Sequence, residues 1–383
     1  HLTLEELKTM RFIVERDALA DGVMWVSRSL SARPIMPVLL GVLIKADKQG
    51  VHLSGYDLET SGKAEVAADV KEEGTVLVSG KLLSDIARAL PNKPVTFSLE
   101  GNRVSVISGS AKFALPTLSV SDYPNLPELP SETGRLSGDL FAEAVGQVAV
   151  AAGKDDSLPV LTGVYVEIEE NKLILAATDR YRLAVRELNW DAPRASASAL
   201  IRARTLNDAA KSLAGVKSVS VALAAATATE RLIGFASEGK VMTSRMLDGT
   251  FPPYRHLLPS ERSATAVVEV APFVDSVRRV ALVADKTVPL RLAFNPGALT
   301  LEAGVGDDAQ ATEEIEIAFD GEALSIAFNP TFLLDGLAAV NSPYVEIAFT
   351  GGSKPAVLSG KSSADGESDF SYRYLLMPMR YSS

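Results

Sequence analysis

Residues that could perform catalysis are few in this chain of 383 residues, and they stand in patterns typical of loops. The adjacent carboxylates Asp155-Asp156 and Asp307-Asp308 could hold a metal ion or exchange protons, but both pairs lie beside expected loops, where solvated turn residues are the commoner case. Gly360-Lys361-Ser362 resembles the end of a phosphate loop, although Pro355 stands where that motif needs its first glycine. We therefore expect no catalytic site, no metal and no cofactor.

Cysteine and histidine are too scarce for the usual metal and nucleophile sites. The chain has no cysteine and only His1, His52 and His256, which excludes disulfides and thiolate ligands. No serine has glycine at both the −2 and the +2 position, so a nucleophile elbow is missing. Two alternatives stay open at this point: an enzyme such as a three-domain nucleotide-binding transferase, and a multidomain binding protein that does not contact DNA.

Composition and charge indicate a folded, acidic protein. Hydrophobic residues make up 47% of the chain and charged residues 22%, which is ordinary for a globular protein. No apolar run reaches about 18 residues, so no membrane-spanning helix is predicted. The absence of cysteine favours a reducing compartment, and we expect a cytoplasmic protein.

Positive charge is concentrated in expected helices and their adjoining turns, whereas acidic residues gather in strands, even though the net charge is −10. A basic face without a base-reading motif suits sequence-independent contact with phosphate. The predicted phosphate-binding residues are Arg28, Arg33, Lys81, Arg88, Lys154, Arg202, Arg204, Lys211, Arg278, Arg279 and Lys286.

The helices that carry these residues recur three times. Residues 81–90, 204–213 and 331–340 have the spacing of an amphipathic helix and share an aliphatic third position, an aspartate at the fifth and an aliphatic last position. The shared aspartates, Asp85, Asp208 and Asp335, lie roughly 125 residues apart, which is the size of a small domain. The last copy contains no basic residue.

Other segments repeat in the same order. A helix over 17–31, 139–152 or 272–285 precedes a strand. The strands over 37–44 and 158–166 have a proline at their first or second residue, Pro37 and Pro159, and share a glycine in register. Each repeat predicts about eight strands and two helices, an α+β domain with antiparallel sheets. We place these domains at residues 10–130, 131–260 and 261–383, and interpret residues 1–9 as a cloning remnant or a native N-terminal extension.

Three passages resemble the bacterial DNA polymerase III β subunit family, the sliding clamps. They are Ser31–Pro34 leading into Pro37-Val38-Leu39, the central Ala177–Val185, and the C-terminal Tyr374–Arg380. Together with the threefold repeat, they extend the resemblance over residues 10–380. The run Leu90-Pro91-Asn92-Lys93-Pro94 is similar to that of actinobacterial members.

The resemblance implies a non-catalytic processivity factor. Its fold would be three repeated DNA-clamp domains that form a closed ring as a head-to-tail homodimer around duplex DNA at the nucleoid. The implied partners are the replicative polymerase α subunit, clamp-loader subunits, repair polymerases, ligase and mismatch-repair factors. Because residues 331–340 carry no basic residue, the third domain would contact DNA through Arg278, Arg279 and Lys286.

The resemblance also implies a hydrophobic pocket for the linear peptides of these partners. Carried over onto this sequence, its residues are Leu161, Thr178, Arg180, Leu183, Pro252, Leu257, Leu375, Met377, Pro378, Met379 and Arg380. Methionine and leucine form an adaptable apolar floor for varied peptides. Arg180 with Tyr181 departs from the family, where this place often holds a small residue, and Leu158 stands where some relatives have a basic one.

Overall fold

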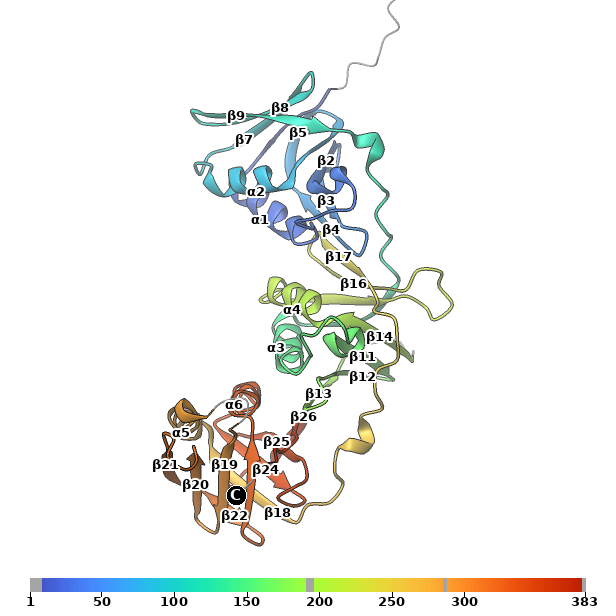
Figure 1. The fold of residues 1–383 in the computed structure, drawn as a ribbon. Coiled ribbons are helices and arrows are strands. Elements are labelled where there is room, and N and C mark those ends of the chain that lie inside the picture. The colour runs from blue at the N-terminus through green and yellow to red at the C-terminus, as the bar shows by residue number, and fades with distance from the viewer. Residues whose placement is uncertain (1–8, 191–195, 285–287, 381–383) are drawn as a thin grey trace, which may run out of the picture. The chain divides into compact units, whose positions relative to one another are not determined.

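The computed structural model describes residues 9–190, 196–284 and 288–380 (Figure 1). Lys286 and nearly all of residues 1–9 therefore lie outside the described residues. Strands β1–β9 with helices α1 and α2 fall in the first predicted repeat, β10–β17 with α3 and α4 in the second, and β18–β26 with α5 and α6 in the third. The expected α+β class with antiparallel sheets is confirmed.

Contacts divide the chain into two compact units that cut across the second repeat. Unit 1 consists of His1–Gly138 and Gly215–Met246, and unit 2 of Asp139–Ala214 and Leu247–Ser383. The domain limits at 130 and 260 remain predictions.

In the part of the chain that the structure describes, unit 1 is built on one antiparallel sheet of 13 strands. In spatial order these are β10 (Glu132–Leu136), β15 (Val219–Leu223), β16 (Leu232–Ser237), β17 (Lys240–Arg245), β4 (Thr60–Val66), β3 (Gly50–Tyr56), β2 (Gly41–Asp47), β6 (Gly74–Ser79), β9 (Ala111–Leu118), β8 (Arg103–Ser108), β7 (Val95–Glu100), β1 (Arg11–Val14) and β5 (Ala68–Glu72).

Helices α1 (Arg16–Ser27) and α2 (Gly80–Ala89) pack against each other on this sheet. Glycines let α1 approach the strands closely, because a Cβ at Gly55 would overlap the carbonyl oxygen of Val26. Gly62 faces α1 in the same way. Since side chains alternate between the faces of a strand, Lys45 and Lys63 point to the face opposite the helices.

The described residues of unit 2 form two sheets. The nine-stranded sheet has the order β14 (Ala197–Arg202), β11 (Gly163–Glu169), β12 (Lys172–Thr178), β13 (Arg182–Asn189), β26 (Ser368–Leu376), β25 (Ala356–Lys361), β24 (Tyr344–Phe349), β18 (Ala264–Glu269) and β22 (Ala318–Asp320). The four-stranded sheet has the order β21 (Ala311–Glu316), β20 (Ala298–Ala303), β19 (Leu290–Asn295) and β23 (Leu324–Phe328). The helices are α3 (Gly138–Ala149), α4 (Ala203–Ser212), α5 (Val270–Val280) and α6 (Pro330–Ala339).

The proline-led segments were wrongly predicted as continuous strands. Residues Pro37–Leu40 and Pro159–Thr162 are single 3₁₀ turns, η1 and η3, and the strands begin only at Gly41 and Gly163. Proline fixes φ near −65° and has no N–H for a sheet, so it starts a turn more readily than a ladder. The first helix is also shorter than expected and ends at Ser27. The N–H groups of Ser29 and Leu30 donate to the carbonyls three residues earlier, of Val26 and Ser27, which closes tight turns instead of a further α-helical turn.

We expect Gly55→Ala to destabilise the protein by about 1–3 kcal/mol, because the added methyl forces α1 away from β3. Gly146→Ala is the matched control, since nothing lies within 4 Å of its added Cβ in α3. It should raise stability by about 0.5–1 kcal/mol through helix propensity. Urea unfolding at one protein concentration measures the free energy of unfolding of both variants. An equal change of this free energy in the two variants would contradict the argument from packing.

Candidate functional site

Part of the predicted peptide site lies where strands of the second and third repeats pair. Leu183 on β13 is opposite Leu375 on β26 and also opposite Thr178 on β12. Leu183 and Leu375 are both at most 4% exposed and belong to a hydrophobic cluster with Phe251 and Tyr254. The structure therefore brings residues that are nearly 200 positions apart into one apolar floor.

The chain beyond β26 is held along the edge of this floor. The N–H of Met377 donates to the carbonyl of Tyr181 at 2.9 Å, and the N–H of Met379 donates to that of Ala327 at 2.7 Å. Met377 is 40% exposed, so it is a surface residue and not the end of a core strand. Pro378 and the exposed Arg380 lie on the same short segment.

The segment 251–257 supplies Pro252 and Leu257, and it is held by aromatic stacking. Phe251 stacks on Tyr165 of β11, with ring centroids 5.1 Å apart, and Tyr254 meets Phe251 edge-on at 6.0 Å. The N–H of Leu257 donates to the carbonyl of Tyr254 at 2.9 Å in the 3₁₀ turn η4 (Arg255–Leu257), which leaves the Leu257 side chain 47% exposed. Leu161 is 8% exposed in η3, and its neighbour Val160 packs against the same cluster.

An arginine fork fixes this segment to the sheet. Arg255 reaches Glu167 Oε1 at 2.6 Å and Glu169 Oε1 at 3.2 Å. Burial raises the pKa of Glu167, whereas the hydrogen bonds from Glu167 and Arg255 lower the pKa of Glu169. The fork therefore positions Leu257 through charge as well as through packing.

A buried arginine organises the turn that presents Arg180. Arg182 is 6% exposed; its Nε lies 3.1 Å from Asp179 Oδ2, its Nη1 lies 2.6 Å from Asp335 Oδ2, and its guanidinium is 4.1 Å from the Phe332 ring centroid. Asp179 Oδ1 also accepts the N–H groups of Tyr181 and Arg182 at 2.9 and 3.1 Å. Arg180 itself is exposed with φ of 81°, in the left-handed region.

The role of Arg182 was not predicted from the sequence, because an arginine in a strand gives no signal of burial. The same network extends to Tyr374, whose hydroxyl donates to the carbonyl of Phe332 at 2.7 Å. Burial raises the pKa of Tyr374 well above its usual range, so the phenol keeps this proton.

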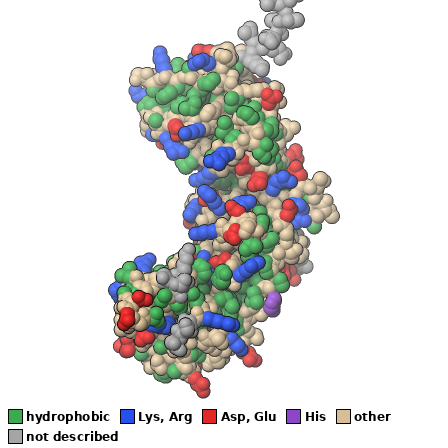
Figure 2. Space-filling model, viewed as in Figure 1, with side chains coloured by type: hydrophobic (Ala, Val, Ile, Leu, Met, Phe, Trp, Pro, Cys, Tyr) green, Lys and Arg blue, Asp and Glu red, His purple; other side chains and the backbone are tan. Residues whose placement is uncertain are grey.

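The predicted phosphate-binding residues of the first two repeats lie on the surface. Arg28, Arg33, Lys81 and Arg88 are exposed on or beside α1 and α2 of unit 1, and Lys154, Arg204 and Lys211 are exposed on or near α3 and α4 of unit 2. Figure 2 shows Lys and Arg side chains over these helices. Arg88 donates to Ser84 Oγ at 2.9 Å, and Arg202 lies 3.7 Å from Asp156 Oδ1, so both side chains have a polar neighbour within their own unit.

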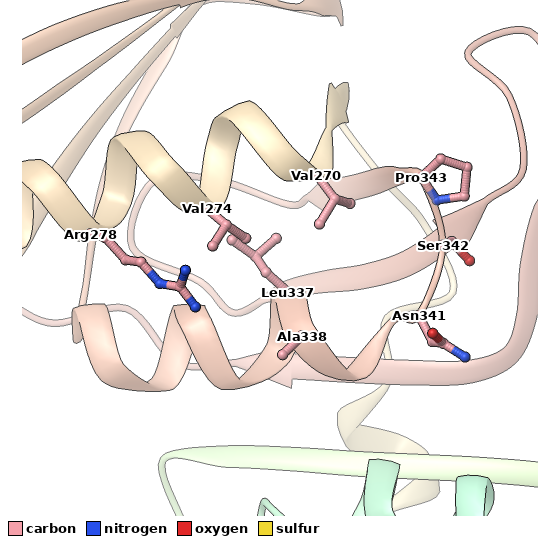
Figure 3. Close-up of a pocket in the computed structure, with 8 residues that line it drawn as sticks. All are labelled: Val270, Val274, Arg278, Leu337, Ala338, Asn341, Ser342 and Pro343. Carbon is pink, nitrogen blue, oxygen red and sulfur yellow. The ribbon is translucent and has the colours of Figure 1, made fainter.

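In the third repeat, the two arginines of α5 have different surroundings. Arg279 makes a bidentate ion pair with Glu313 on β21, at 2.8 and 2.7 Å, which lowers the pKa of Glu313. Arg278 is exposed and extends from α5 across an open groove toward α6, to one side of Val274 and Leu337 (Figure 3). Arg278 thus extends positive charge toward the helix that has no basic residue.

Within the described residues, no group of three or more His, Cys, Asp and Glu side chains is arranged to hold a metal ion. Across the same residues, every helix is too short or too polar to span a membrane.

Asp335→Ala should destabilise the protein by about 1–3 kcal/mol, because Arg182 would keep only one carboxylate in a buried site. Asp85→Ala removes the aspartate at the same position of the repeated helix, where it is exposed, and should change stability by at most about 0.5 kcal/mol. Chemical denaturation compares the two variants. A similar loss of stability in both variants would mean that the aspartate stabilises the helix itself and not the Arg182 network.

Comparison with known proteins agrees with this geometry. The models of the N-terminal, central and C-terminal domains of the DNA polymerase III β subunit match residues 10–127, 135–253 and 255–380. The chain is 53% identical to the β sliding clamp of Streptomyces coelicolor, over 97% of this chain and 100% of that protein. It is 49% identical to the β sliding clamp of Micrococcus luteus, over 80% of this chain and 98% of that protein. Both organisms are actinobacteria, in agreement with the prediction from Leu90–Pro94.

Solved structures lead to the same family. A sliding clamp of Pseudomonas aeruginosa bound to griselimycin superposes with a TM-score of 0.89 at 26% identity, covering 97% of this chain and 100% of that one. The chain therefore belongs to the DNA polymerase III β subunit family, the β sliding clamps, which are non-catalytic processivity factors of DNA replication.

Proposed function

We propose that this clamp holds duplex DNA, without reading its sequence, through the exposed basic residues of its helices. The observation that carries the proposal is the separation of charge in unit 1. Arg28, Lys81 and Arg88 are exposed with α1 and α2, whereas the exposed residues of β5 and the residue after it are mostly acidic, with Asp69, Glu72 and Glu73 against Lys71. Phosphate contacts of this kind give affinity without specificity, as sliding requires. The site of action would be the nucleoid in the cytoplasm.

The double substitution Lys81→Glu with Arg88→Glu should weaken low-salt binding to a duplex. If both residues contact phosphate, the slope of log K against log salt should fall by roughly 1.8, which is about 0.9 for each phosphate that the variant no longer neutralises. Fluorescence anisotropy with a labelled duplex measures this slope.

Lys45→Glu with Lys63→Glu is the control for net charge. These exposed lysines lie on the face opposite the helices, so the same change in charge should leave the slope nearly unaltered. An equal decrease of the slope in the two double variants would show that only the net charge affects DNA binding. In that case α2 would not contact DNA.

We further propose that the predicted peptide site binds the replicative polymerase α subunit and the other implied partners through short hydrophobic segments. Exposed Leu257 and Met377 beside the buried floor of Leu183 and Leu375 support this proposal, because apolar side chains exposed at the rim of an apolar floor favour a hydrophobic anchor. The P. aeruginosa clamp binds griselimycin, and we propose that this compound occupies the same site here.

Met379→Ala should weaken binding of a polymerase α subunit peptide about five- to fiftyfold, since it removes part of an adaptable apolar wall. Isothermal titration gives the affinity, and displacement by griselimycin shows that the peptide occupies this site. Thermal stability should stay near that of the parent because Met379 is half-buried at the end of the chain. A large loss of stability together with affinity would assign Met379 to the core instead.

The proposed ring is a head-to-tail homodimer in which the first repeat of one copy meets the third repeat of the other. Two edge strands are complementary. The 111–116 part of β9 pairs only with β8 among the described strands and carries Lys112, whereas the edge strand β21 carries Glu314 and Glu316 in addition to Glu313, which is paired with Arg279. Figure 2 shows acidic side chains gathered around β21. Leu282, in the turn Ala281–Val283 that follows α5, is 83% exposed, and α5 packs against β21; we therefore propose that Leu282 supplies an apolar contact at this interface.

Leu282→Asp should therefore convert the dimer to monomer at micromolar concentration, because it places a charge in an apolar contact. Size-exclusion chromatography with light scattering measures the molar mass of the protein in solution and so distinguishes dimer from monomer. Met379→Ala, which lies outside the proposed interface, should remain dimeric. A dimeric Leu282→Asp variant would contradict this choice of interface.

A further inference from the structure

The turn between β12 and β13, residues 178–182, closes one end of the apolar floor of the candidate peptide site. Leu183, which directly follows the turn, is opposite Leu375 on β26. The N–H of Met377 donates to the carbonyl of Tyr181 at 2.9 Å, so the turn also holds the chain beyond β26. A side chain exposed on this turn therefore stands at the end of the floor.

The backbone N–H groups from Asp179 to Arg182 all donate within the turn. The N–H of Asp179 donates to the carbonyl of Arg182 at 3.4 Å, and the N–H of Arg180 donates to Thr178 Oγ1 at 3.2 Å. Asp179 Oδ1 accepts the N–H groups of Tyr181 and Arg182. These hydrogen bonds fix the conformation of Arg180, whose φ of 81° lies in the left-handed region that glycine adopts most easily.

Among the described residues, Arg180 is the one charged side chain of this turn without a partner. Arg182 is 6% exposed and is paired with Asp179 and Asp335, whereas the exposed Arg180 makes no ion pair. An arginine here costs backbone strain and returns no contact within the chain. Strained positions of this kind gather at ligand sites, which indicates a role for the Arg180 side chain in binding.

The chemistry of Arg180 indicates the type of group that it binds. A guanidinium keeps its charge, offers only donors, and matches the two oxygens of a carboxylate. The next residue, Tyr181, is 62% exposed, and its ring stacks on that of Phe332 with centroids 6.4 Å apart. Apolar surface is thus exposed beside the cation and continues the floor, which favours a peptide over the phosphates of DNA.

We infer that Arg180 selects partner peptides that carry an acidic residue beside the hydrophobic anchor, an inference that rests on the proposed peptide site. The N–H groups of its guanidinium donate to the Glu or Asp carboxylate at the end of the anchor that reaches the turn. A lysine or arginine at that place is repelled. The floor thus sets the apolar anchor, and Arg180 narrows the choice of partner by charge.

The test uses the polymerase α subunit peptide with a Gln on each side of its anchor, and variants with Glu or Lys on either side. With the parent protein, Glu should bind about three- to tenfold more tightly than Gln on one side only, because Arg180 stands at one end of the floor. Lys on that side should bind more weakly than Gln. Isothermal titration gives the affinities, and added salt should reduce the preference for Glu because exposed charges are screened.

Three variants assign the preference to Arg180. Arg180→Asn should bring the ratio of Glu to Gln affinity to about one, Arg180→Glu should reverse it in favour of Lys, and Arg180→Lys should retain part of it. Asn tolerates the left-handed region, so the unfolding temperature of Arg180→Asn should stay near that of the parent. Lys172→Gln is the matched control, since it removes an exposed positive charge at the other end of β12 and should keep the full ratio.

The outcomes separate the inference from the peptide site. No preference for Glu in the parent, or a full preference in Arg180→Asn, overturns the inference alone. A loss of duplex affinity in Arg180→Asn well beyond that in Lys172→Gln would assign Arg180 to DNA instead. Failure of the parent to bind the Gln peptide overturns the peptide site and the inference together.

Discussion

The ion pair between Arg182 and Asp335 is the interaction on which the candidate peptide site depends. Arg182 belongs to the second repeat and Asp335 to the third, and their side chains meet at 2.6 Å in a largely buried place. A buried arginine is stable only if a carboxylate neutralises its charge and acceptors bind its N–H groups. Those partners must therefore stand at fixed positions around it. The strand pairing of Leu183 with Leu375 and the tail hydrogen bond of Met377 to Tyr181 both lie beside it.

The repeated helix shows how one buried framework supports different surfaces. In the repeated segments 81–90, 204–213 and 331–340, the third and last positions are buried in all three copies, as Leu83, Leu206 and Leu333 illustrate for the third. The aspartate in the fifth position has no such common role. It is exposed at Asp85, whereas Asp335 is drawn into the pair with Arg182. Internal repetition therefore preserves packing, while exposed positions are free to acquire separate functions.

The segment after β17 has a double use in unit 2. Its aromatic residues Phe251 and Tyr254 belong to the hydrophobic cluster under the candidate peptide site, and Arg255 holds the segment to β11 by an ion pair with Glu167. Its continuation, residues 258–262, lines a cavity together with residues of β24, β25 and β26. A connecting segment that is packed on a sheet in this way presents side chains as rigidly as a strand does, which suits the recognition of short peptides with little ordering cost.

The sequence by itself determined the repeat architecture, the two helices per repeat and the family, because amphipathic periodicity and the passages around Arg182 and Met377 are local patterns. It was wrong about the strands at Pro37 and Pro159, since a short apolar run does not distinguish a strand from a 3₁₀ turn. Only the tertiary structure decided that Arg182 is buried, that Arg279 is paired with Glu313, and that Glu346 and Arg373 line one cavity. Each of these depends on strands or helices distant in sequence, and the partner of a charge cannot be read from spacing along the chain.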